Sequence, residues 1–202
     1  MKLLRNMIDT LIPQKKRGNL SRFYIIKYIY NKLMALNGVK NITVILVYDN
    51  FGDKVENEDD EVLLFENYNE LGNLKHHERL KHDLKRNYFE RGSILFAFAE
   101  NEKIVASTWL HINFDPEGDI DLLKTENYYS GGPKFVEIEY RNQGLGKRLN
   151  RSICCYASKH GKYPTYLANQ IDNIPTIKTS IKTGFRLSNL IIRLKRDEVL
   201  VL

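Results

Sequence analysis

The 202-residue sequence predicts a chain of the α/β (α+β) class, in which a mixed central sheet is flanked by helices and follows an N-terminal helical extension. Two observations predict this class. Runs of β-branched and aromatic residues alternate with segments whose apolar residues recur every three or four positions. A glycine turn also opens directly into a basic helix. With 43% apolar residues and no internal repeat, the chain can bury a substantial core.

The extension begins with an amphipathic helix, because apolar residues recur at helical spacing over 3–12 and Pro13 ends the pattern. A second helix is predicted over 21–37, with Ser21 as its N-cap and Gly38 after its end. The first helix could dimerise or dock through its apolar face, or lie on an anionic membrane surface. These alternatives stay open.

Charge is divided unevenly along the chain. Residues 1–40 hold nine Lys or Arg and one acid, a balance of +8, whereas the net charge of the whole chain is +6. The remaining residues therefore sum to −2. The main body is nearly neutral, and any polyanionic partner would meet the extension. No basic stripe with interleaved aromatic residues follows, so we expect no nucleic acid as partner.

An apolar run over 42–47 predicts a strand, and the acidic stretch that follows it over 49–61 predicts a solvated loop. We place the boundary between two parts in this loop. Residues 1–60 form the basic helical extension with one strand and the acidic loop, and residues 61–202 form the core.

The first half of the core is predicted as strand, two helices and a hairpin. The strand covers 62–66, the helices cover 68–74 and 76–91, and the antiparallel hairpin joins 94–99 to 104–113 across a polar turn.

The second half begins with a long glycine- and proline-bearing loop over 115–133, in which residues 127–129 are either an ordered part of the loop or the start of the next strand. A strand over 134–139 runs into the glycine turn, which opens the basic helix. A short strand follows over 163–168, and a last helix begins after Asn173.

The turn at 141–146 reads Arg-Asn-Gln-Gly-Leu-Gly. Gly144 and Gly146 let the backbone approach a ligand closely, and the free N–H groups of the first helical turn favour an anion. This spacing resembles the coenzyme A pyrophosphate loop of the GNAT acyltransferase superfamily. Asn-Ile-Pro-Thr at 173–176 and Ile-Lys-Thr-Gly-Phe at 181–185 match two further parts of that pattern. The resemblance covers about residues 61 to 195 and implies a GNAT fold of about six to seven strands.

The resemblance also implies acetyl-CoA as the acyl donor, and it assigns the donor contacts to one set of residues. These are Val136, Arg141, Gln143, Gly144, Leu145, Gly146, Lys147 and Asn173. The five histidines show no ligand spacing and no cysteine pair completes a site, so we expect no metal.

An amine acceptor must lose a proton before it attacks, so a carboxylate is the expected general base. Glu137 and Glu139 are the first candidates, and strand alternation would send both to the same face. His111 and Asp115 are rivals. Ser180 stands where many GNAT enzymes carry a tyrosine that protonates the departing thiolate, so we assign it the acid role.

The expected function is transfer of an acetyl group from acetyl-CoA to a small-molecule primary amine by direct attack in a ternary complex. An amino sugar or sugar nucleotide is the suggested acceptor. Two alternatives remain: a non-catalytic module that binds coenzyme A or a partner, and an acyltransferase that takes a longer chain from acyl-carrier protein. No signal peptide or membrane span is recognised, so we expect a cytoplasmic enzyme.

Overall fold

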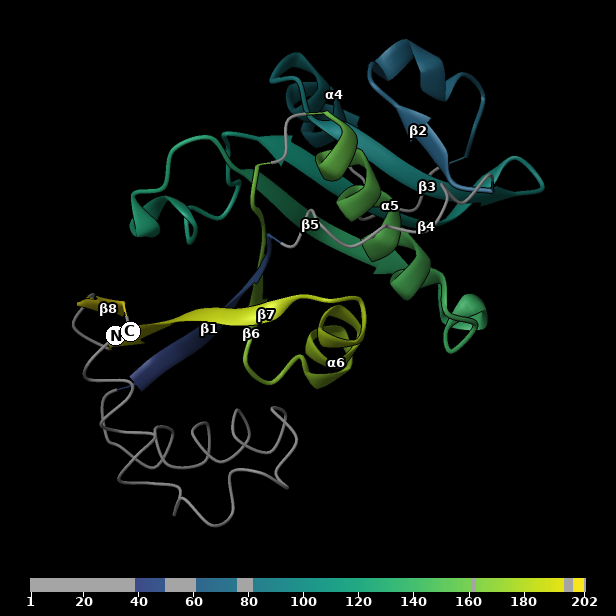
Figure 1. Ribbon diagram of the computed structural model, residues 1–202. Coiled ribbons are helices and arrows are strands. Elements are labelled where there is room, and N and C mark those ends of the chain that lie inside the picture. The colour runs from purple at the N-terminus through teal and green to yellow at the C-terminus, as the bar shows by residue number, and fades with distance from the viewer. Residues whose placement is uncertain (1–38, 50–60, 76–81, 161–162, 195–197, 202) are drawn as a thin grey trace.

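A computed structural model describes residues 39–49, 61–75, 82–160, 163–194 and 198–201. The two predicted N-terminal helices and most of the acidic loop, with the boundary after residue 60, lie outside these residues. In the described part, eight strands form one mixed sheet flanked by helices (Figure 1). This confirms the predicted fold class.

The strands follow the order β2-β3-β4-β5-β6-β1-β7-β8 across the sheet. Neighbours pair antiparallel except β5 and β6, which pair parallel. The strands are β1 (Val39–Tyr48), β2 (Leu63–Phe65), β3 (Ile94–Glu100), β4 (Lys103–Ile112), β5 (Tyr129–Val136), β6 (Thr165–Gln170), β7 (Arg186–Leu194) and β8 (Val199–Val201).

Strand β1 lies inside the sheet, between β6 and β7, although we had counted its residues with the extension. Its sequence explains this position. Ile42, Val44 and Leu46 pack into the main core cluster, while Ile45 packs into a second cluster on the opposite face. A strand that is apolar on both faces is buried on both faces. The sheet therefore exceeds the expected six to seven strands.

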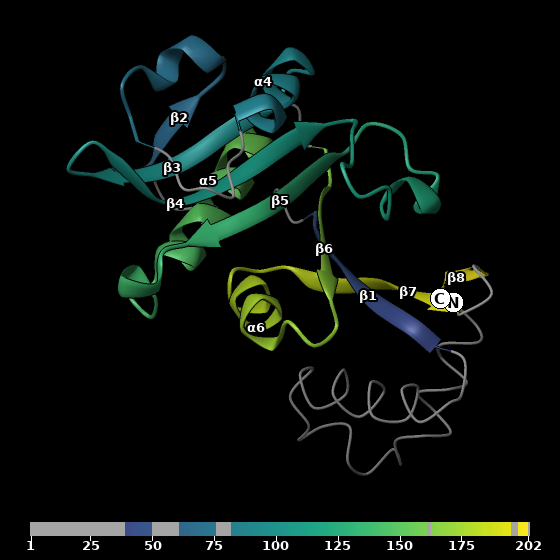
Figure 2. The same cartoon turned by 180° about the vertical axis from the view of Figure 1, so that it is seen from behind.

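Helices cover both faces of the first half of the sheet (Figures 1 and 2). Helix α5 (Leu145–Lys159) packs on β3, β4 and β5. The short 3-10 helix η1 (Tyr68–Leu71) and helix α4 (His82–Glu90) contribute to a separate core cluster. Successive side chains of β3 point to opposite faces of the sheet, so Phe96 packs in the core cluster under α5 and Leu95 packs in the cluster under α4.

Strand β5 begins earlier than the predicted 134–139 and ends at Val136. The prediction that Glu137 and Glu139 share one strand face is therefore wrong. Glu137 is the N-cap of a 3-10 helix, η3 (Ile138–Tyr140), which contains Glu139. The chain leaves the ladder here because it turns toward the start of α5 (Figure 1).

Strands β5 and β6 pair only from Tyr129 to Gly131 and then separate (Figures 1 and 2). A β-bulge lies at the same point. Thr108 of β4 pairs with Lys134 and Leu110 pairs with Gly131, so two residues of β5 oppose a single residue of β4. One of the two is Pro133, which has no N–H to offer a neighbouring strand. The separation opens a space between β5, β6 and helix α6 (Ile174–Lys182).

Candidate active site

The glycine turn leads from η3 into the first turn of α5. Gly144 is the N-cap of α5 with φ of 84°, a left-handed conformation that favours glycine. No backbone carbonyl of the described residues accepts a hydrogen bond from the N–H of Gly144, Leu145 or Gly146. A Cβ at Gly146 would meet no atom within 4 Å, so this side of the turn is open. Free N–H groups at the start of a helix favour an anionic group.

Two of the predicted donor contacts also stabilise the turn itself. Arg141 donates from Nε to the carbonyl oxygen of Val136 at 3.2 Å, and Gln143 donates from Nε2 to that of Glu139 at 3.1 Å. These bonds tie the turn to the end of β5 and to η3. Lys147 is exposed on the first turn of α5. The structure therefore brings Val136 and the predicted residues from 141 to 147 together.

Asn173 lies apart from the turn, as the N-cap of α6, and its side chain makes no capping hydrogen bond. It lines a cleft of about 350 Å³ at the place where β5 and β6 separate. The cleft is bounded by the start of α6, the loop after β4, and both separated strands. Its lining residues are Tyr88, Thr108, Asp115, Pro116, Glu117, Ser130, Gly131, Gly132, Pro133, Lys134, Leu167, Ala168, Asn169, Gln170, Asn173 and Thr176.

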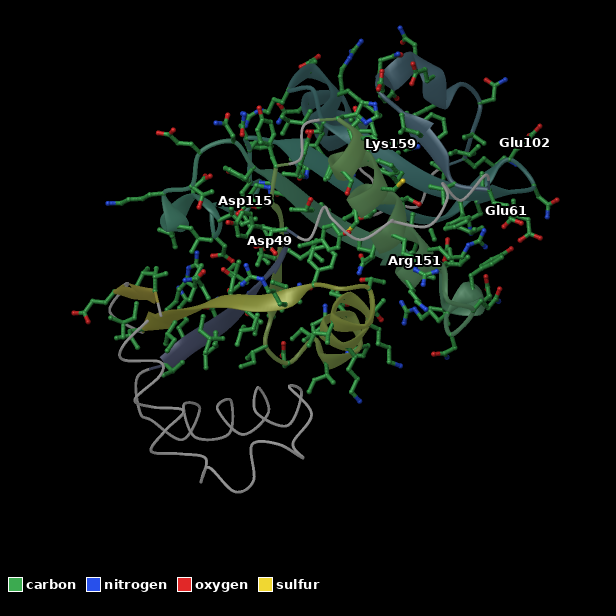
Figure 3. All side chains as sticks on the ribbon, viewed as in Figure 1. Asp49, Glu61, Glu102, Asp115, Arg151 and Lys159 are labelled. Atoms are coloured by element: carbon green, nitrogen blue, oxygen red, sulfur yellow. The ribbon has the colours of Figure 1, made fainter. Side chains whose placement is uncertain are left out.

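The loop after β4 places two carboxylates at the cleft. Asp115 is buried and accepts hydrogen bonds from the backbone N–H of Ile120 at 2.7 Å and of Glu117 at 3.3 Å. Burial raises the pKa of Asp115 above its usual value. Burial also raises the pKa of Glu117, and repulsion from Asp115 adds to that shift. Carboxylates with raised pKa are suited to accept a proton near neutral pH. In Figure 3, Asp115 lies well away from Arg151 of α5.

Neither Glu137 nor Glu139 lines this cleft. Glu137 forms an ion pair with Lys103, with 2.8 Å between Oε1 and Nζ, and Glu139 is exposed on η3. Asp115, which the sequence analysis kept only as a rival, is the candidate that the fold brings to the cleft. Glu117 was missed, because nothing in the loop sequence indicates which side chains turn inward.

His111 does not line the cleft, because it is fully buried beneath it. Its Nε2 lies 2.7 Å from the carbonyl oxygen of Gly132, and its Nδ1 lies 2.7 Å from Oγ of Ser93. The carbonyl can only accept, so Nε2 carries the proton and Nδ1 accepts from the serine. Burial lowers the pKa of His111 to about 4, which keeps the ring neutral.

Ser180 is fully buried between α5 and α6. Its hydroxyl donates to the carbonyl oxygen of Thr176 at 3.0 Å and accepts from Nδ2 of Asn150 at 3.2 Å. Asn150 is itself fully buried in α5, and its Oδ1 accepts a hydrogen bond from Nζ of Lys134. A polar chain thus runs from the cleft through α5 into α6. Sequence reasoning treated Lys134 only as a strand residue.

The model of the Acetyltransferase (GNAT) family matches residues 61–185. The chain belongs to the GNAT acetyltransferase family. The match covers both the glycine turn and the segment from Asn173 to Phe185, so the two motifs lie in one family domain. A search among curated proteins found no match.

Solved structures share the GNAT fold at low sequence identity. A GNAT-family protein from Novosphingobium aromaticivorans is 14% identical with a TM-score of 0.55, over 74% of this chain and 61% of that one. A GNAT-family acetyltransferase from Colwellia psychrerythraea is 15% identical with a TM-score of 0.54, over 83% of this chain and 61% of that one. The chain thus spans about three fifths of the length of these two structures.

A third structure is fungal. It is a multi-domain GH3 β-N-acetylglucosaminidase that contains a glucosamine N-acetyltransferase region. It is 14% identical with a TM-score of 0.50, over 85% of this chain and 22% of that one. At this identity the likeness shows the fold alone.

Two further observations concern the described residues only. None of their helices is long and apolar enough to cross a membrane. They contain no group of three or more His, Cys, Asp or Glu side chains placed to hold a metal ion.

Proposed function

We propose that the protein transfers an acetyl group from acetyl-CoA to a primary amine by direct attack in a ternary complex. One observation carries the proposal. Strand β5, which leads through η3 to the glycine turn, also lines a cleft, and that cleft holds two carboxylates of raised pKa. Donor and acceptor can therefore meet along β5.

The donor would be held mainly by the backbone of the turn. The N–H groups of Gly144, Leu145 and Gly146 and the helix dipole of α5 suit a pyrophosphate, and Lys147 adds a positive charge beside them. Asn173, at the edge of the cleft, suits the amide-bearing arm of coenzyme A. A donor bound at these two places would present its thioester in the cleft.

The acceptor amine must be neutral when it attacks. Asp115 and Glu117 line the cleft, so either can take a proton from a bound ammonium group, directly or through water. The same two charges favour a cationic acceptor before the reaction. Glu137 and Glu139 remain predicted bases, and their positions outside the cleft make them the weaker pair.

For the acceptor we propose an amino sugar, free or linked to a nucleotide. Such a molecule carries one amine among many hydroxyl groups, and the cleft lining offers polar partners such as Thr108, Asn169 and Thr176. A glucosamine N-acetyltransferase region occurs on the same fold in the fungal protein above. The fold admits this chemistry, although it does not select it.

The test has two parts. A thermal-shift titration measures acetyl-CoA binding, and a thiol-release assay measures turnover against amino sugars, sugar nucleotides, simple amines and peptides. We expect a rise in melting temperature and release of free thiol with amino sugars.

Each other outcome changes the proposal in a defined way. Binding without turnover for any acceptor would favour a non-catalytic module that binds coenzyme A. Turnover only with an acyl-carrier protein as donor would favour a longer acyl chain. Thiol release with peptides or simple amines, but not with sugars, would sink the amino-sugar acceptor.

A further inference from the structure

A chain of polar side chains links the cleft to the position of the missing tyrosine. Lys134 of β5 lines the cleft, and its Nζ donates to Oδ1 of Asn150 in α5. Nδ2 of Asn150 in turn donates to Oγ of Ser180 at 3.2 Å and to Oγ1 of Thr183 at 3.3 Å, both near the end of α6. One asparagine side chain therefore separates the amine of Lys134 from Ser180.

Ser180 is poorly placed to act as an acid. It is fully buried, and its only proton is donated to Thr176 within the same helix. Protonating a ligand in the cleft would require this bond to break and the side chain to emerge from the core. The hydroxyl of Ser180 instead fixes Asn150, which fixes Lys134.

We propose that Lys134 is a catalytic residue, and that its ammonium group protonates the sulfur that leaves when the acyl group is transferred. This inference rests on the proposed function. Lys134 lies beyond the bulge at Gly132, on the part of β5 that has left β6. Its side chain lines the cleft and reaches Asn150 of α5. It takes over the part that the resemblance assigned to a tyrosine on α6.

The electrostatic surroundings suit a proton donor. No ion pair to Lys134 occurs among the described residues, and burial lowers the pKa of its ammonium to about 8. The titratable group that acts on its charge is Cys154 of α5, and Asp115 and Glu117 line the same cleft. Cys154 is buried with a raised pKa and stays a neutral thiol. A thiol has a pKa of about 8.5, so transfer of the proton from lysine to sulfur is nearly balanced in free energy.

The step balances in atoms and charge. The acceptor nitrogen forms the new C–N bond while the thioester C–S bond breaks, and the electron pair of that bond goes to sulfur. Lys134 gives its proton to the sulfur and becomes neutral. The acceptor ammonium loses one proton before it attacks and a second as the C–N bond forms. Asp115 or Glu117 takes each of these protons and passes it to water, and Lys134 regains its proton from water.

Three substitutions separate the possible roles of Lys134. Lys134→Met removes both charge and proton, Lys134→Gln keeps a hydrogen-bond donor for Asn150, and Lys134→Arg keeps the charge but does not release a proton near neutral pH. Lys178→Met is the matched control, because Lys178 is an exposed lysine on α6 that does not line the cleft. Thermal unfolding and an acetyl-CoA titration confirm in each variant that fold and binding survive.

We expect kcat with acetyl-CoA to fall about 10- to 100-fold in all three Lys134 variants, with KM for acetyl-CoA changed much less. The loss should shrink with an acetyl ester of an aromatic thiol, since that thiolate is stable without a proton. A purely structural role would lower both activities equally. Full activity in Lys134→Arg would assign the effect to charge alone and overturn the proton transfer.

A second readout does not use turnover. Labelling of the free enzyme with an amine-reactive reagent across pH, followed by peptide mass spectrometry, should give Lys134 a midpoint near pH 8. A midpoint above pH 10 for Lys134 would overturn the proposal. So would an acetyl group on Lys134 that transfers to the acceptor, because Lys134 would then be a nucleophile. If the unaltered protein releases no thiol, the proposed function itself is refuted. If the unaltered protein is active and the Lys134→Met variant is equally active, only this inference is refuted.

Discussion

Nε2 of His111 donates a hydrogen bond to the carbonyl oxygen of Gly132, 2.7 Å away, and so ties the buried part of β4 to the bulge of β5. Oγ of Ser93 donates to the other ring nitrogen, which fixes the tautomer. His111 thus positions the strand that lines the cleft. This is a structural role, whereas the sequence suggests His111 as a possible general base.

This arrangement predicts a loss of stability in acid. The pKa of His111 is about 4 in the folded protein, below the value near 6.5 expected for an unfolded chain. The unfolded state therefore binds more protons, and the free energy of unfolding should drop as pH falls from about 6.5 towards 4. The contribution of this residue is about 3 kcal/mol.

Urea titrations of the unaltered protein and of His111→Gln at pH 7 and pH 4 test this linkage. The substitution should cost about 1–3 kcal/mol at pH 7, because it disturbs two buried hydrogen bonds. It should also reduce the difference between the two pH values. An unchanged difference would show that His111 is not the residue whose protonation destabilises the fold.

Gly146→Ala separates ligand binding from folding. A Cβ at this position meets no atom within 4 Å in the free protein, and alanine in a helix is favoured over glycine by about 0.5–1 kcal/mol. The melting temperature should hold or rise. The affinity for acetyl-CoA should fall at least about tenfold, which is about 1.4 kcal/mol, because the methyl group occupies the side that a pyrophosphate would approach.

Isothermal titration calorimetry measures this affinity. Gly144→Ala is the contrasting variant, since φ of 84° makes the backbone strained there, at a cost of about 1–2 kcal/mol of stability. If Gly146→Ala binds as tightly as the unaltered protein, the glycine turn is not the pyrophosphate site.

Glu117→Gln tests the general base. It removes a cleft carboxylate whose side chain makes no hydrogen bond to the described residues, whereas Asp115 accepts hydrogen bonds from two backbone N–H groups. We expect kcat/KM for the amine to fall about 10²- to 10⁴-fold if Glu117 is the base, with a smaller loss at high pH where the amine is already neutral.

Glu137→Gln measured beside it tests the earlier candidate, and Glu126→Gln, an exposed residue outside the cleft, is the control. A large loss in Glu137→Gln with none in Glu117→Gln or Asp115→Asn would return the base to the end of β5.

Gly131→Ala should disturb the pairing of Gly131 with Leu167, which is the last residue pair before β5 and β6 separate. A Cβ there would lie 2.4 Å from Cδ2 of Leu167 and 3.1 Å from Cδ1 of Ile153. Overpacking of this kind typically costs about 1–3 kcal/mol.

Leu167→Ala should relieve most of that clash in the double variant, so the two changes should be less destabilising together than their separate effects imply. Chemical denaturation of the single and double variants measures the coupling. Strictly additive effects would mean that the two side chains do not meet.

Much of the fold could be predicted from local patterns. The hairpin of β3 and β4, the strand β2 and the start of α6 after Asn173 were placed within a few residues, because alternation and turn residues act over short stretches. Strand β5 was misplaced at both ends. Its first residues lie beside glycines that suggested a loop, and only pairing with β4 and β6 makes them a strand.

The candidate site divides in the same way. The glycine turn was predictable, since one continuous segment builds it. Glu117 and Lys134 were not, because their roles depend on which helix or loop faces them. Ser180 was recognised by its place in a motif. Its burial against Asn150 could not be predicted, because it depends on the packing of α5 on α6.

By itself the sequence determined the order of the main strands and helices from β1 to α6, the sharp turn before α5 and the resemblance to the GNAT family. These depend on neighbours along the chain, where spacing and side-chain type are sufficient. Only the tertiary structure decided that β1 lies between β6 and β7, that the bulge parts β5 from β6, and that the amine of Lys134 reaches Asn150. Each of these joins residues far apart in the sequence, and such contacts are selected by the burial of apolar faces and the pairing of buried polar groups, which no local pattern encodes.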